Sequence, residues 1–135
     1  MTITRPDDLK ILITGGARGI GAATASLLAS GGARVVITDV LNPEGEALAA
    51  ELGDSVHYRR LDVTRSEDWS AAVTAAEKTM GGLNALFNNA GILEFGSVDA
   101  CSAESFRRVL DINLTGCFLG ISAATPQWKS PSAAR

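Results

Sequence analysis

The segment 14–21, Thr-Gly-Gly-Ala-Arg-Gly-Ile-Gly, constrains the fold more than any other feature of the sequence. It follows the apolar run 10–14, which is typical of a buried parallel strand, and it leads into the Ala- and Leu-rich run 20–29, which is typical of a helix. A nucleotide-binding βα unit places its phosphate loop between such a strand and helix. The segment therefore predicts an α/β chain with an anion site at the start of its first long helix.

The residues of this segment have separate predicted roles. Gly15 permits a tight turn, Gly19 lets the backbone approach a pyrophosphate, and Gly21 lets the helix pack close to the strand. Arg18 and Ile20 lie between these glycines, where the free N–H groups of the helix N-terminus favour an anion. The segment alone leaves open the alternative of a strand-to-helix turn that binds nothing.

Asp39 argues against that alternative. It ends a second apolar run, 34–38, and lies 18 residues after Gly21, near the spacing of an acid that binds the adenosine ribose hydroxyls. Its carboxylate would repel a 2′-phosphate, which favours NAD(H) over NADP(H) as the cofactor. Arg18 favours the opposite choice, because a guanidinium can contact a 2′-phosphate. Asp39 has more weight because its charge lies closer to the ribose.

Predicted strands and helices alternate along the rest of the chain. Two further strands are predicted, at 56–63 and 84–87. Three further helices are predicted from their capping residues: Asn42 to Gly53, a Thr64–Glu67 capping box to Met80, and Ser102 to just before Pro126. The alternation predicts a Rossmann-like, doubly wound parallel sheet with helices on both faces, and the less apolar third strand is expected near an edge.

Composition excludes several classes of function. The chain is 46% hydrophobic and 20% charged, as expected for a soluble globular domain, and its net charge of -3 comes with no basic patch for nucleic acid. No apolar run approaches the roughly 20 residues that span a bilayer, and the N-terminus lacks the apolar stretch of a signal peptide. We therefore expect a cytoplasmic protein without membrane or nucleic-acid partners.

A metal site is also not expected. Cys101, Cys117 and the single His57 match no metal-ligand spacing. Both cysteines are predicted to be free thiols that pack as small apolar groups.

Three later motifs extend the pattern in order: Leu-Asp-Val at 61–63, Asn-Asn-Ala-Gly at 88–91 and Asp-Ile-Asn-Leu-Thr-Gly at 111–116. With the glycine segment, they resemble the short-chain dehydrogenase/reductase family, whose glycine motif is Thr-Gly-x-x-x-Gly-x-Gly. The resemblance covers roughly 9–129, which we take as the NAD-binding domain, between an N-terminal extension at 1–8 and a tail at 130–135. Within the family, the chain looks most like bacterial 3α(20β)-hydroxysteroid dehydrogenases.

The resemblance implies roles for these motifs. Asp62 would lie near the adenine amino group and Val63 against the adenine ring. A second set would brace the sheet and line the nicotinamide-side ribose: Asn89, Ala90 and Gly91. Asn113 corresponds to the asparagine of the family's catalytic tetrad.

Each of these motifs also has a purely structural interpretation. Asp62 could be the residue before a helix N-cap. Asn88 and Asn89 could satisfy backbone groups of their loop. Asn113 could mark a kink or a buried hydrogen-bond anchor, which is compatible with its place in the tetrad.

The rest of the family's catalytic set has no match in these 135 residues. The family uses a Ser to orient the substrate carbonyl, and a Tyr and a Lys, in a Tyr-x-x-x-Lys pattern, for proton exchange. The single tyrosine, Tyr58, has Asp62 four residues later, and Ser130 comes too early to be the serine. The resemblance therefore implies the NAD-binding part of a truncated dehydrogenase of secondary alcohols or ketones, hydroxysteroids included, which would act on a substrate only when completed.

A different class of function remains open. The chain could be a non-catalytic module that binds NAD and needs a partner chain. The helix 104–125 is apolar enough to demand a partner, and the corresponding helix of the family packs between subunits, which implies a homo-oligomer. NADH binding with or without turnover separates the two hypotheses.

Overall fold

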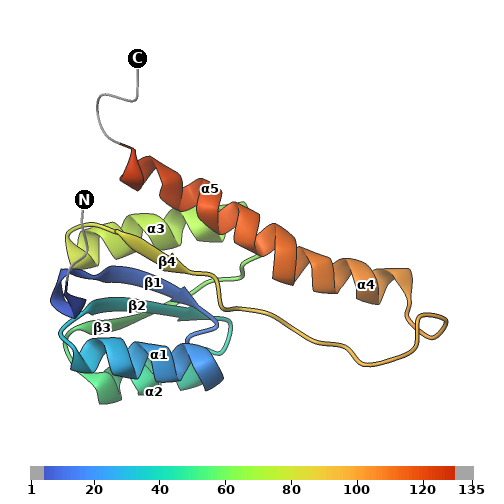
Figure 1. Ribbon diagram of the computed structural model, residues 1–135, viewed down its shortest axis with the longest axis horizontal. Helices are drawn as coiled ribbons and strands as arrows, with labels where there is room; N and C mark the ends of the chain where they lie inside the picture. The colour runs from blue at the N-terminus through green and yellow to red at the C-terminus, as the bar shows by residue number, and fades with distance from the viewer. Residues whose placement is uncertain (1–4, 130–135) are drawn as a thin grey trace.

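A computed structural model of the chain describes residues 5–129 (Figure 1). Four parallel strands form one sheet in the order β3-β2-β1-β4: β1 (Lys10–Thr14), β2 (Arg34–Asp39), β3 (Val56–Arg60) and β4 (Ala85–Phe87). The register pairs Ile13 with Ile37 of β2 and with Phe87 of β4, so β1 is central. The predicted Rossmann-like parallel sheet is confirmed, and the third strand lies at an edge as expected.

Helices cover both faces of this sheet. On one face lie α1 (Gly19–Ser30) and α2 (Asn42–Leu52), and on the other lie α3 (Ser66–Met80) and α5 (Gly116–Trp128) (Figure 1). A loop from β4 leads out to α4 (Ala103–Leu110), which joins α5 through the π-helical turn η2 (Asp111–Thr115). A short 3-10 helix, η1 (Pro6–Asp8), precedes β1, within the predicted N-terminal extension. The predicted tail at 130–135 lies outside the described residues.

Alternate residues of the strands feed two separate cores. Ile11 and Ile13 face α1 and α2, whereas Leu12 between them faces α3 and α5. The core on the α3 side centres on Trp69, which is fully buried and donates its indole N–H to the Val63 carbonyl at 2.9 Å. The two cores hold the strand ends in fixed positions relative to each other.

Two predicted helix boundaries and one predicted strand boundary are wrong. The Thr64–Glu67 capping box does not form, because the N-cap of α3 is Arg65 and the Thr64 hydroxyl donates to Asp62 instead. Helix α2 has Leu41 as its N-cap, so Asn42 lies in the first turn. The third strand ends at Arg60, so the motif 61–63 lies beyond it.

The last helix also continues past its predicted end. Helix α5 includes Pro126 and ends at Trp128. A proline there removes the N–H that would bond the Ser122 carbonyl. The Trp128 indole N–H donates to the Leu83 carbonyl at 3.1 Å, and this bond ties the extra turn to the body of the domain.

The continuous helix Ala103–Trp128 has 26 residues, and an 18-residue window of it has a mean hydropathy of 1.2, so by length and composition alone it could cross a bilayer. No uninterrupted apolar run of the sequence is this long, so the sequence did not predict a helix with this average hydropathy. One stripe of this helix packs on the domain: Gly116 lies against Val63 and Gly120 against Trp69, where an added Cβ would come within 2.8 Å and 2.5 Å of them. The helix is thus a layer of the α/β fold.

Candidate dinucleotide site

The carboxyl ends of all four strands border one cavity of about 350 Å³. Its lining comes from the segments that follow β1, β2, β3 and β4, and from the π-helical turn: Gly15, Arg18, Gly19, Asp39, Val40, Leu41, Leu61, Asp62, Val63, Asn89, Ala90, Gly91, Ile92 and Ile112. In the order β3-β2-β1-β4, the chain runs from β1 through β2 to β3 and then crosses to β4 on the other side of β1. The switch point, where open α/β sheets bind ligands, therefore lies between β1 and β4.

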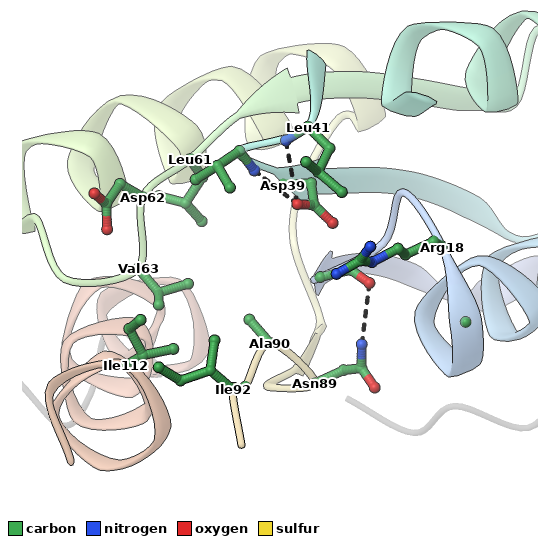
Figure 2. Close-up of a pocket in the computed structure, with 14 residues that line it drawn as sticks. Arg18, Asp39, Leu41, Leu61, Asp62, Val63, Asn89, Ala90, Ile92 and Ile112 are labelled. Carbon is green, nitrogen blue, oxygen red and sulfur yellow. Dashed lines mark hydrogen bonds between the residues drawn. The ribbon is translucent and has the colours of Figure 1, made fainter. Parts of the chain in front are cut away.

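The cavity separates apolar from charged lining. Figure 2 shows Val63, Ile92 and Ile112 grouped on one side, with Arg18 and Asp39 on the other. Arg18 is exposed and is the N-cap of α1, so it directly precedes the free N–H groups at the start of that helix. An apolar slot next to a cationic helix start suits a ligand that carries both a flat ring and a phosphate.

Two glycines of the loop after β1 have the left-handed backbone that glycine permits, with φ of +62° at Gly15 and +58° at Gly19. A Cβ on Gly19 would meet nothing within 4 Å, so its backbone is open to a ligand. A Cβ on Gly21 would lie 2.3 Å from the Gly15 carbonyl oxygen, so only glycine lets α1 start this close to the loop. The close packing predicted for Gly21 is present, but the helix packs there against the glycine loop and not against the strand.

Asp39 ends β2 and turns its carboxylate toward the cavity. One carboxylate oxygen, Oδ1, accepts the backbone N–H groups of Val40 and Leu41 at 2.8 Å and 3.2 Å, and Oδ2 accepts the Ala17 N–H at 3.1 Å. A carboxylate has about four acceptor positions, so three bonds leave one for a ligand hydroxyl. The bond to Ala17 also ties the acid to the glycine loop, which fixes their spacing.

Asp62 follows β3 at the opposite side of the cavity. Its Oδ1 accepts the Thr64 hydroxyl at 2.7 Å and the Thr64 N–H at 3.0 Å, which leaves Oδ2 available. The Thr64 hydroxyl bond is the main reason that the Asp62 pKa lies below its ordinary value, with burial opposing it. The alternative that Asp62 directly precedes a helix N-cap is wrong, because α3 has Arg65 as its N-cap.

Asn89 joins the loop after β4 to the glycine loop. Its amide donates to the carbonyls of Thr14 and Gly15 at 3.0 Å and 3.1 Å, and the Thr14 hydroxyl accepts the N–H groups of Asn89 and Ala90. Asn88 donates to the Cys117 carbonyl at 3.4 Å. Both asparagines therefore satisfy backbone groups, but these belong to β1, the glycine loop and α5 and not to their own loop as the structural interpretation expected. Asn89 does so at the cavity wall.

Asn113 lies in the π-helical turn and clamps the same loop. Its Oδ1 accepts the Ile92 N–H and its Nδ2 donates to the Ile92 carbonyl, both at 2.8 Å. π-Helical turns often occur at functional sites because they redirect side chains. The expected hydrogen-bond anchor is present, but Asn113 is exposed, not buried.

The structure brings together most of the predicted site residues. Nine of them line the cavity: Gly15, Arg18, Gly19, Asp39, Asp62, Val63, Asn89, Ala90 and Gly91. Ile20, Gly21 and Asn113 lie next to lining residues. The sequence interpretation assigned no role to five apolar lining residues: Leu61 and Ile112 lie within the motifs, and Val40, Leu41 and Ile92 lie next to predicted site segments.

The two cysteines agree only in part with what the sequence predicted for them. Cys101 and Cys117 are free thiols as predicted, but Cys101 is exposed and does not pack as a small apolar group. Within residues 5–129, no cluster of His, Cys, Asp or Glu has the arrangement of a metal site.

Comparison with known proteins places these features in a family. The family model described as short chain dehydrogenase matches residues 9–135. The 3-alpha-(or 20-beta)-hydroxysteroid dehydrogenase of Mycobacterium bovis is 48% identical over 118 residues, 87% of this chain and 45% of its own. The trans-4-hydroxycyclohexanecarboxylate dehydrogenase of Sinomonas cyclohexanicum is 46% identical over 128 residues, 88% of this chain and 49% of its own.

A solved structure agrees with the fold. The 3-ketoacyl-(acyl-carrier-protein) reductase of Brucella melitensis, complexed with NADH, superposes with a TM-score of 0.86 at 35% identity, over 91% of this chain and 51% of that one. The chain thus spans about half the length of the relatives that it matches.

Proposed function

Because the chain belongs to the short-chain dehydrogenase family, we propose that its cavity binds NAD(H) in preference to NADP(H). The observation that carries this proposal is Asp39, whose carboxylate is fixed in the cavity by three N–H groups and keeps one acceptor position. That position suits a ribose hydroxyl, whereas a 2′-phosphate would face a fixed negative charge. The reductase complexed with NADH supports a dinucleotide in this fold.

The other lining residues divide among the parts of the dinucleotide. The pyrophosphate would lie at the start of α1, on the backbone of Gly15, Gly19, Ile20 and Gly21, beside the Arg18 guanidinium. Asp62 would accept from the adenine amino group, with Val63 against the ring. Asn89, Ala90 and Gly91 would face the nicotinamide-side ribose.

Bound NAD supplies hydride chemistry: the nicotinamide accepts a hydride from a secondary alcohol, or its reduced form donates one to a ketone. Asn113 is the single residue that matches the family's catalytic set, and its contacts make it a clamp on the loop at Ile92. No Tyr-x-x-x-Lys pair occurs in the 135 residues. We therefore expect this chain to hold the cofactor, and a hydroxysteroid or similar alcohol to react only where those groups are supplied.

A second candidate function, a non-catalytic module that associates with a partner chain, is favoured by the continuous helix 103–128. Several large apolar side chains on it are exposed, including Phe106, Leu114, Phe118 and Ile121. Such a surface is typical of an interface between chains. A homo-oligomer through this helix is the simplest arrangement that covers it.

The direct test measures NADH and NADPH binding by fluorescence and turnover on a panel of secondary alcohols. We expect NADH to bind more tightly, without turnover. Asp39→Asn should weaken NADH about tenfold and NADPH much less, because a hydrogen bond to a charged group is lost while repulsion of the 2′-phosphate is relieved.

Asp54→Asn, at an exposed acid outside the cavity, is the matched control and should change neither affinity. No NADH binding, or equal NADH affinity with and without Asp39, would contradict the proposal. Turnover by the chain alone would contradict the expectation that its catalytic groups are incomplete.

A further inference from the structure

Tyr58 lies outside the cavity and contacts the segment that carries Asp39. It is in β3, paired with Ile37 of β2, and its ring packs against the first turns of α2. A Cβ on Gly45 would come within 2.1 Å of the ring atom Cε2, so the ring occupies the space that any other residue at 45 would fill. The ring and the glycine together fix where the phenol oxygen points.

The phenol oxygen contacts two groups at the ends of the turn 39–42. It lies 3.0 Å from the Asp39 carbonyl oxygen and 2.7 Å from the Asn42 side chain. The Asn42 atom at this distance is Oδ1, an acceptor, so the single phenol proton is shared between Asn42 Oδ1 and the Asp39 carbonyl oxygen. One hydroxyl then joins both ends of the turn.

The same carbonyl also accepts the Leu61 N–H at 3.0 Å. The two lone pairs of the Asp39 carbonyl are thus both used, one by the backbone of the next strand and one by Tyr58. Between the tied ends lie Val40 and Leu41, whose N–H groups hold the Asp39 carboxylate and whose side chains line the cavity. A shift of this turn would move the carboxylate and the cavity wall together.

The phenol remains a donor over a wide pH range. Burial, and then the negative charge of Asp39, raise the pKa of Tyr58 above its ordinary value of 10.0. The phenol therefore keeps its proton at neutral pH.

We propose that Tyr58 is a positioning residue for cofactor choice, whose hydroxyl holds the turn 39–42 so that the Asp39 carboxylate selects NADH over NADPH. The proposal rests on the proposed function of the cavity. Tyr58 does not itself line the cavity, so its effect on a bound nucleotide must pass through Asp39.

The test is the ratio of the NADPH and NADH dissociation constants. Tyr58→Phe keeps the ring on Gly45 and removes only the hydroxyl. We expect it to weaken NADH about fivefold, the usual scale of one hydrogen bond, and to leave NADPH nearly unchanged, so that the ratio falls about fivefold. Trp128→Phe, which removes an aromatic N–H bond to the Leu83 carbonyl away from the cavity, is the matched control and should leave the ratio unchanged.

A double-mutant cycle distinguishes positioning from general support of the fold. In the Asp39→Asn background, Tyr58→Phe should no longer change the ratio, because the hydroxyl acts through the carboxylate. Gly45→Ala, which displaces the ring, should lower the ratio as Tyr58→Phe does. A ratio unchanged by Tyr58→Phe in a chain that binds NADH, or one that falls equally in both backgrounds, overturns the inference. If the unsubstituted chain does not bind NADH, the proposed function fails, and the inference fails with it.

Discussion

The two helices that cover the same face of the sheet use their apolar residues in opposite ways. Helix α3 buries large side chains, including Trp69, Val73 and Met80. The helix 103–128 fully buries only its small residues Gly116, Gly120 and Ala124. Ile112 and Leu119 pack partly against the core, and most of its other large apolar residues are exposed. Small residues let two helices approach closely, whereas outward apolar residues contribute nothing to this chain's own core.

This difference shows which part of the domain the cavity depends on. The cavity is bordered by the strand ends and by the π-helical turn, and these are held by the Trp69 core and by the Asn113 clamp. The exposed apolar face of the helix 103–128 belongs neither to the Trp69 core nor to the Asn113 clamp. Substitutions can therefore separate the stability of the site from the association of the chain.

The largest expected effect is at Trp69. Trp69→Ala removes a fully buried indole and its bond to the Val63 carbonyl, and should lower the free energy of unfolding by about 3–5 kcal/mol. Urea denaturation followed by circular dichroism measures this. Trp128→Phe, at a partly exposed position of α5, should cost about 1 kcal/mol or less. Equal losses in the two variants would contradict a core centred on α3.

A smaller effect is expected where α5 meets that core. In Gly120→Ala, the new methyl group would lie 2.5 Å from Trp69, and the overpacking should cost about 1–3 kcal/mol in the same assay. Gly96→Ala is the control, because a Cβ there meets nothing within 4 Å. If Gly120→Ala leaves the free energy of unfolding unchanged, α5 does not pack on Trp69.

The outward face should respond in association and not in stability. The double variant Leu114→Ser with Phe118→Ser changes two exposed side chains, at 64% and 66% exposure, and should shift the free energy of unfolding by only about 0.5 kcal/mol per site. We expect the unsubstituted chain to self-associate at micromolar concentration in sedimentation experiments and the double variant to do so much less. An unsubstituted chain that sediments as a monomer would remove the case for an interface here.

The smallest effect concerns pH. Because the folded-state pKa of Asp62 lies below its ordinary value of 3.8, its ionised form stabilises the fold above that value, and this contribution is lost as the pH falls through the folded-state pKa. Thr64→Val removes the hydroxyl bond that chiefly lowers this pKa, so the pKa should rise toward 3.8. An NMR titration of the Asp62 carboxyl measures the shift. An unchanged pKa would show that the bond to Thr64 does not hold the carboxylate.

Local sequence patterns predicted the fold class, because they report on short-range physics. The glycine segment marked the strand-to-helix turn, and Asp39 marked the end of the second strand, so the strand ends could be placed together. Helix boundaries were less predictable. Thr64 is a residue type that often caps helices, yet its hydroxyl donates a hydrogen bond to Asp62 instead. A side chain with two possible partners is assigned only when both are positioned.

The sequence by itself determined the α/β alternation, the parallel sheet and the polar residues at its carboxyl edge, because periodicity and turn chemistry are local properties. Only the tertiary structure decided which apolar neighbours wall the cavity, and that Tyr58, 19 residues from Asp39, ties down the turn that carries it. It also decided that the last helix packs on its glycines. These contacts join residues far apart in the chain, and no local pattern records such a distance.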